Sequence, residues 1–112
     1  MRTRRDPLVT TTLGTSRELV SFHFGAPGGG EKAYVQASLH ADEMPAMLTA
    51  WTLKQRLAEL EAQGRLRGEI VVVPVANPIG LSQHVLGQFV GCFEANSGHN
   101  FNRGFPMPAP PR

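Results

Sequence analysis

Hydrophobic and polar positions form two different patterns along the middle of the chain. Residues 33–39 and 69–75 are short runs of strand-forming residues, and the second has consecutive apolar side chains without polar alternation. Such a run is typical of a strand buried on both faces of a parallel sheet. Residues 43–63 instead repeat apolar side chains at three- and four-residue spacings, which predicts an amphipathic helix. The pattern therefore predicts two parallel strands joined by a helix in a right-handed crossover.

The segments before this unit give weaker signals. Residues 8–13 and 19–24 are each rich in strand formers, and the turn residues 14–17 between them predict a hairpin or a pair of edge strands. Residues 1–7 are charged and end in a proline, so we expect a flexible arm. The sequence thus predicts that regular structure begins near residue 8.

The segments after the second core strand are less regular. Residues 76–80 read as a turn, and residues 81–102 have no clear period, so we expect an ordered loop with one short helical turn over 82–86. Residues 106–112 contain four prolines and are expected to form a tail without regular structure. The overall expectation is an α/β fold: a mixed sheet with a parallel βαβ core.

Length and charge narrow the class of protein. A chain of 112 residues suits one small domain, and it has no apolar run approaching the roughly 20 residues of a membrane span. The net charge is +2, and the basic residues are divided between the first five positions and the helix, which does not make a nucleic-acid surface. The first residues lack the apolar core of a signal peptide and there is a single cysteine, so we expect a cytoplasmic protein without nucleic-acid or membrane partners.

An imidazole and a carboxylate fall where the first core strand meets the helix. His40 closes the strand pattern and Glu43 opens the helix pattern, and ligands of open α/β sheets gather at the carboxyl ends of strands. Nitrogen and oxygen donors of this kind suit a divalent metal such as zinc. The same residues also allow a structural interpretation, in which Asp42 caps the helix, Glu43 complements its dipole and His40 is a partly buried strand-end residue.

A second polar group lies near the end of the chain. Asn102 stands next to Arg103, and a planar guanidinium beside an amide can hold a carboxylate through parallel N–H bonds. Taken alone, this pair is also what an ordinary surface loop would contain.

The order of these motifs resembles that of a known family. A strand ending in His-x-x-Glu, a helix, the strand Val-Val-Val-Pro-Val-Ala-Asn-Pro-x-Gly and then Asn-Phe-Asn-Arg-x-Phe-Pro are similar to the succinylglutamate desuccinylase/aspartoacylase family, in the zinc carboxypeptidase-like superfamily. The resemblance covers residues 33–106. It implies the first half of a zinc carboxypeptidase-like domain and a zinc-dependent deacylase that cleaves the amide or ester bond of an N-acyl amino acid or similar small carboxylate substrate. By resemblance, His40 and Glu43 are metal ligands, and Asn102 and Arg103 bind the substrate.

The sequence also departs from the family pattern. The family's third zinc ligand and its general-base Glu come from later segments, so no catalytic residue is assigned, and His23, His84 and His99 do not match the missing ligand. Where relatives tend to have Arg, this chain has Cys92, which we interpret as a small buried thiol, since a nucleophilic role would require a depressed pKa.

We therefore expect one partial domain with an arm at 1–7, a deacylase-like portion at 8–105 and a tail at 106–112. An isolated piece of this kind is expected to self-associate through an exposed sheet edge. Two alternatives remain open at this point: a non-catalytic module that binds carboxylates, and an inactive remnant of such an enzyme.

Overall fold

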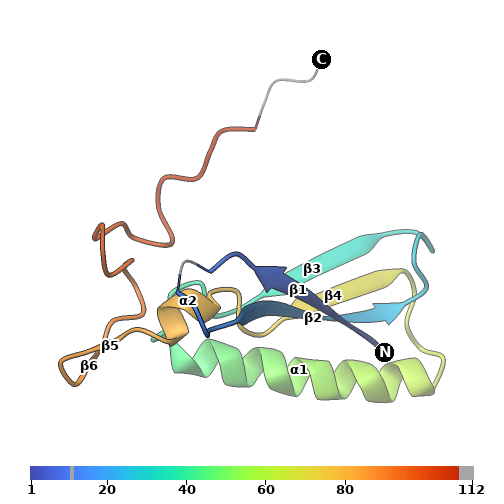
Figure 1. The fold of residues 1–112 in the computed structure, drawn as a ribbon. Coiled ribbons are helices and arrows are strands. Elements are labelled where there is room, and N and C mark those ends of the chain that lie inside the picture. The colour runs from blue at the N-terminus through green and yellow to red at the C-terminus, as the bar shows by residue number, and fades with distance from the viewer. Residues whose placement is uncertain (11, 109–112) are drawn as a thin grey trace.

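Four strands form a mixed sheet in the computed structural model, which describes residues 1–10 and 12–108. The order across the sheet is β1-β2-β4-β3, and β3 is parallel to β4 while the other neighbours are antiparallel. The strands are β1 (Arg2–Leu8), β2 (Arg17–Gly25), β3 (Lys32–Gln36) and β4 (Glu69–Val73) (Figure 1). The predicted α/β fold with a mixed sheet and a parallel βαβ core is confirmed.

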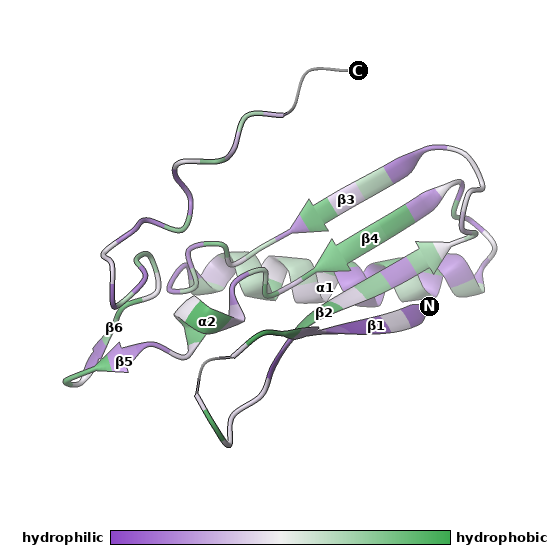
Figure 2. Cartoon of the chain, turned by 45° about the horizontal axis from the view of Figure 1, so that its top comes forward, coloured by the Kyte–Doolittle hydropathy of each residue, from purple (hydrophilic) through white to green (hydrophobic). Residues whose placement is uncertain are grey.

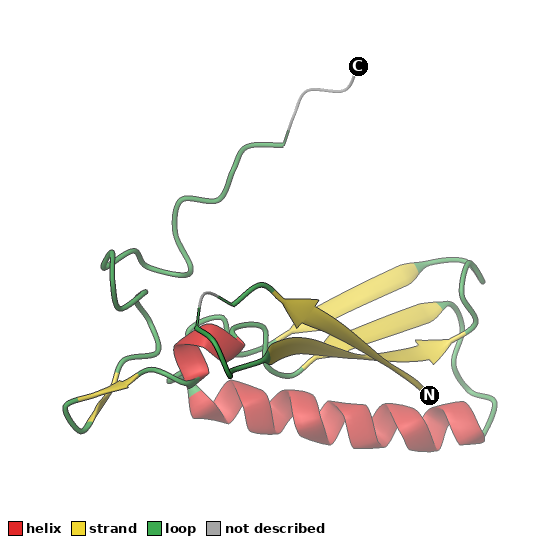
Figure 3. Ribbon diagram, viewed as in Figure 1, coloured by secondary structure: helices red, strands yellow, loops and turns green. Residues whose placement is uncertain are grey.

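Helix α1 (Met44–Ala62) runs along one face of the sheet (Figure 3). Its bounds lie within one residue of the prediction. Pro45 falls in the first turn, where a missing backbone N–H costs nothing, and Gly64, at φ +66°, follows the last turn. The core beneath the helix is built from four buried side chains: Phe24, Ala50, Leu57 and Val72.

The central strand β4 is buried on both faces, as its sequence predicts. Val71, Val72 and Val73 are each at most 4% exposed. Only one face carries a helix in the described part of the chain, however. On the other face Val71 and Val73 lie at the floor of a shallow hollow whose walls are side chains of neighbouring strands: Arg4, Asp6, Leu19, Ser21, His23, Lys32 and Tyr34.

The predicted flexible arm over residues 1–7 is wrong, because residues 2–8 form β1. This edge strand pairs antiparallel with β2, from Arg2 opposite His23 to Leu8 opposite Arg17. Charged side chains suit an edge strand, because both of its faces reach solvent and the charges discourage a further strand from pairing with it. Figure 2 shows the contrast between hydrophilic β1 at the edge and hydrophobic β4 inside the sheet.

The strand predicted at 8–13 is displaced as a result. Residues 9, 10 and 12–16 connect β1 to β2 without strand pairing, and Leu13 is 98% exposed; residue 11 lies outside the described residues. The predicted hairpin therefore exists, but its first strand lies earlier in the chain, and its second strand, β2, extends beyond the predicted residues 19–24 at both ends.

The segment after β4 is more ordered than its composition suggests. Helix α2 (Pro78–Leu81) replaces the helical turn expected over 82–86, and a small hairpin follows, with β5 (His84–Val85) and β6 (Gln88–Phe89). The helix starts early because Asn77 accepts a hydrogen bond from the backbone of Gly80 at 2.8 Å. Residues 106–108 lack regular structure, as expected; positions 109–112 of the predicted tail are not among the described residues.

No helix in the described ranges is long and apolar enough to cross a membrane.

Candidate metal and carboxylate site

The chain turns sharply between β3 and α1. The strand predicted to reach residue 39 ends at Gln36, and Ser38 then adopts a left-handed backbone with φ +63°. This conformation is unfavourable for any residue but glycine, and such strain is found most often at functional sites. Ser38 is 3% exposed, and its hydroxyl has no hydrogen-bond partner within the described part of the chain. The turn places His40 beside the start of α1.

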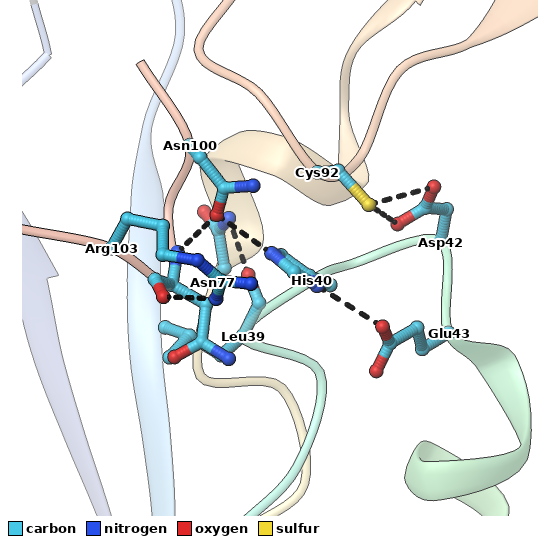
Figure 4. Close-up of polar contacts among 9 residues, drawn as sticks. Leu39, His40, Asp42, Glu43, Asn77, Cys92, Asn100 and Arg103 are labelled. Atoms are coloured by element: carbon cyan, nitrogen blue, oxygen red, sulfur yellow. Dashed lines mark hydrogen bonds and ion pairs between the residues drawn. The ribbon is translucent and has the colours of Figure 1, made fainter.

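The His40 ring lies between two oxygen atoms (Figure 4). Its Nδ1 is 3.0 Å from Oε1 of Glu43, and its Nε2 is 2.8 Å from Oδ1 of Asn100. Both partners favour the protonated ring, so the pKa of His40 is raised above its usual value, first by the hydrogen bond to Asn100 and then by that to Glu43. The ring is 14% exposed, whereas the Glu43 carboxylate is 65% exposed. This arrangement suits a cation bound between imidazole and carboxylate.

Asp42 does not cap the helix, so that part of the structural interpretation is wrong. Glu43 occupies the N-cap position without a side-chain capping bond. Both Asp42 oxygens instead accept the Cys92 thiol, at 3.0 and 3.2 Å. This hydrogen bond, burial, and the charges of Asp42 and Glu43 raise the pKa of Cys92 to about 11. A nucleophilic thiol requires the opposite shift.

The side chain of Asn77 links the turn after β3 to helix α2. Its Nδ2 donates to the Leu39 carbonyl at 3.0 Å, while its Oδ1 caps α2 through Gly80. The sequence contained a signal for this role, because Asn followed by Pro is a common start of a helix. The side chain is buried, so both of its polar ends are satisfied internally.

At Gly91 the later loop makes a close backbone contact with the same turn. Its carbonyl accepts the Ala41 N–H at 3.0 Å, and a Cβ at this position would lie 2.4 Å from the backbone nitrogen of Asp42. Only glycine allows this approach of the two backbones. The loop that carries Cys92 and Asn100 is thereby fixed against the turn that carries His40.

The Asn102–Arg103 pair is brought next to the His40 turn through Asn100. The backbone N–H of Asn102 donates to Oδ1 of Asn100 at 2.8 Å, and Arg103 Nη1 donates to the Asn102 carbonyl at 2.7 Å. Figure 4 shows Arg103 on one side of Asn100 and His40 on the other. Sequence reasoning singled out both of these residue pairs, whose roles stay predictions, but missed Asn100, whose side chain contacts His40 across 60 positions and Asn102 within the loop.

Two of the other histidines lie elsewhere. His84 stacks on Phe89 with ring centroids 4.7 Å apart, and His23 lies within the sheet, 2.9 Å from the hydroxyl of Ser21. Within residues 1–10 and 12–108, no group of three or more His, Cys, Asp or Glu side chains could hold a metal ion. The described residues therefore provide two candidate ligands, His40 and Glu43.

These two donors fit part of a zinc site. Zinc binds His nitrogen and carboxylate oxygen at about 2.0–2.2 Å, which places two donors of a tetrahedral shell roughly 3.3 Å apart. The observed separation of 3.0 Å between Nδ1 and Oε1 is close to that spacing. The second ring nitrogen is held by a hydrogen-bond acceptor, as metal-bound histidines usually are.

Comparison with known proteins places this chain in a family. Residues 29–109 match the family described as the succinylglutamate desuccinylase/aspartoacylase catalytic domain. Since the match covers more than half of the chain and includes the His40 turn and the Asn102–Arg103 pair, the chain belongs to this family.

Two solved structures have a similar fold. A succinylglutamate desuccinylase/aspartoacylase family protein from Shewanella amazonensis SB2B superimposes with a TM-score of 0.82 and 27% identity over 97% of this chain. A protein assigned to the same group from Shewanella frigidimarina NCIMB 400 gives 0.74 and 22% over 96%. The present chain spans only 29% and 28% of the length of these two proteins. A search of curated proteins finds no significant match.

Proposed function

We propose that this chain supplies two zinc ligands of a zinc-dependent deacylase, together with the residues that bind the carboxylate of its substrate. The substrate is an N-acyl amino acid or a similar small carboxylate. The observation that carries the proposal is the His40 ring, whose Nδ1 faces Glu43 at 3.0 Å while Asn100 holds its other nitrogen. Membership of the desuccinylase/aspartoacylase family supports the same chemistry.

The residues of this chain would divide the work. His40 and Glu43 would hold the zinc, which when bound polarises the carbonyl of the scissile bond. Arg103, which is an exposed residue, and the amide of Asn102 would anchor the substrate carboxylate. The proximity of the two residue pairs supports this division, because Asn100 contacts both His40 and Asn102.

The site is incomplete within the described residues. Catalytic zinc sites normally use three protein ligands and keep one position open. We therefore propose that this chain is part of a longer hydrolase and needs a third ligand and a general base from outside residues 1–112. The two longer structural relatives support this proposal.

Zinc titration by competition with a chromogenic chelator tests the proposal. We expect weak one-to-one binding that is lost in His40→Ala and in Glu43→Ala, since each removes one of the two donors. His84→Ala is the matched control, because this ring stacks on Phe89 in the β5–β6 hairpin, and it should bind zinc like the native chain. Binding that is indifferent to His40 would contradict the proposal.

A module that binds carboxylates without catalysis is the second candidate. Arg103 is exposed beside the His40 turn, and the described residues provide no group of three metal ligands. Stabilisation of the chain by succinylglutamate in a thermal-shift assay without zinc, abolished by Arg103→Ala, would favour this second function if zinc binding is absent.

A further inference from the structure

We infer that Asn100 is a positioning residue for His40: it fixes the ring so that Nδ1, and not Nε2, is the metal-binding nitrogen. This inference rests on the proposed metal site. It concerns a residue 60 positions away from the histidine, in a loop rather than in the turn or helix that present the ligands.

The orientation of the Asn100 amide follows from its second partner. The backbone N–H of Asn102 points at one end of this amide at 2.8 Å, and a backbone N–H can only donate. The atom facing it must therefore be the oxygen, Oδ1. The same oxygen lies 2.8 Å from Nε2 of His40, so Nε2 must carry the proton.

This tautomer leaves the opposite nitrogen ready for a cation. When the ring is neutral and Nε2 is protonated, Nδ1 presents a lone pair, and that lone pair faces the Glu43 carboxylate oxygen at 3.0 Å. Two electron-rich atoms at this distance repel each other unless a positive charge lies between them. Either a proton or a divalent metal removes the repulsion, and Asn100 thereby makes the His40–Glu43 pair a site for cations.

Asn100 is itself held in place by the backbone of its loop. It forms an isolated antiparallel bridge with Phe93, and its carbonyl accepts the N–H of Arg103 at 3.2 Å. The adjacent residue, Phe101, donates its N–H to the Cys92 carbonyl at 3.0 Å. One side-chain oxygen thus links the metal-binding turn to the loop that carries the carboxylate-binding pair.

Nitrogen-15 NMR of the histidine rings tests this role in the metal-free chain, at a pH where the His40 ring is neutral. We expect the native chain to show the Nε2–H form, Asn100→Ala to show a mixture of both tautomers, and Asn100→Asp to retain Nε2–H because its carboxylate still accepts that proton. Asn96→Ala is the control, since Asn96 lies in the same loop and contacts Glu94 instead. An unchanged tautomer in Asn100→Ala would overturn the inference.

Zinc affinity provides a second measurement on the same variants. Removing a hydrogen-bond partner of a metal-bound histidine typically costs about 10–100-fold in affinity, which we expect for Asn100→Ala, with recovery in Asn100→Asp and no change in Asn96→Ala. Equal zinc affinity in the native chain and Asn100→Ala, with binding still dependent on His40, would overturn the inference and leave the proposed function standing. A tautomer that depends on Asn100 in a chain that binds no zinc would show that Asn100 orients the ring, but it would overturn the proposed metal site and with it the metal-binding role of Nδ1.

Discussion

Two neighbouring carboxylates at the start of α1 have different partners. Glu43 faces the His40 imidazole, whereas Asp42 accepts the Cys92 thiol. Negative charge beside an imidazole favours its protonated, positive form, while negative charge beside a thiol disfavours the thiolate. One turn of the chain therefore favours the protonated form of the His40 ring and the neutral form of the Cys92 thiol.

The thiol can be tested by its reactivity, because Cys92 is the single cysteine of the chain. With a pKa of about 11 rather than 9.0, it should form about 100-fold less thiolate near neutral pH than an unperturbed thiol. We expect Asp42→Asn to lower this pKa and to accelerate alkylation by iodoacetamide at least about tenfold at pH 8. The pH dependence of the alkylation rate measures the pKa, and Asp6→Asn in β1 serves as control. A native thiol that titrates near 9 would refute this account.

The residues of the site differ in how far the sequence could reveal them. The contact between His40 and Glu43 was predictable because the two residues lie within four positions of each other at a recognisable boundary between strand and helix. Asn100 was not, because its role depends on a contact across 60 positions and asparagine is common in loops for local reasons. The Asp42 contact was misjudged because an acidic residue before a helix usually caps it, and only the folded chain brings the thiol within 3.0 Å.

Among the elements, the strands with apolar sequences were predictable and the charged one was not. Residues 69–73 carry an unambiguous strand signal, whereas residues 2–8 look like a solvated arm until a neighbouring strand is available to pair with them. Electrostatic attraction helps to hold β1 and β3 in the sheet. Glu69 in β4 lies 3.6 Å from Arg2, 3.6 Å from His23 and 3.3 Å from Lys32, one basic side chain from each of the other strands.

This cluster makes the stability of the sheet depend on pH. The hydrogen bond and charge of Lys32, with smaller contributions from His23 and Arg2, lower the pKa of Glu69. A carboxylate with a lowered folded-state pKa stabilises the fold above its unfolded pKa of about 4.3, and this stabilisation is lost as the pH falls through the folded pKa. We expect Glu69→Gln to unfold at lower urea concentration at pH 7 and to lose less stability than the native chain on acidification to pH 3. Glu59→Gln, on the exposed surface of α1, is the control, and a native-like acid response in Glu69→Gln would contradict the prediction.

The molecule as a whole leaves apolar surface open. Met44, Leu48 and Trp51 on α1 are 53%, 68% and 45% exposed, and they line a groove with Pro74 and Val75 beyond the end of β4. A contiguous patch of this kind usually marks a surface that another segment or chain covers. The present chain spans less than a third of the length of the two structural relatives.

Within residues 1–10 and 12–108, no strand pairs with the outer edge of β3. Glu31 accepts the Glu69 N–H at 2.9 Å and Ala37 donates to the Val73 carbonyl at 3.0 Å, so these odd-numbered residues direct their backbone groups toward β4. Backbone groups alternate in direction along a strand, which turns the N–H and C=O of Tyr34 outward. An edge with unpaired groups of this kind is a template for another strand.

We propose that copies of the isolated chain pair along this edge, and Tyr34→Pro tests the proposal. Proline removes the outward N–H of residue 34 without breaking a bond to β4, and it is tolerated on edge strands. We expect the native chain to sediment as larger species at higher concentration, and Tyr34→Pro to remain monomeric with similar thermal stability. Tyr34→Ala keeps the N–H while removing the same side chain, so it should associate like the native chain. Association that disappears equally in both variants would assign it to the tyrosine side chain, and association that persists in both would move it to the apolar groove on α1.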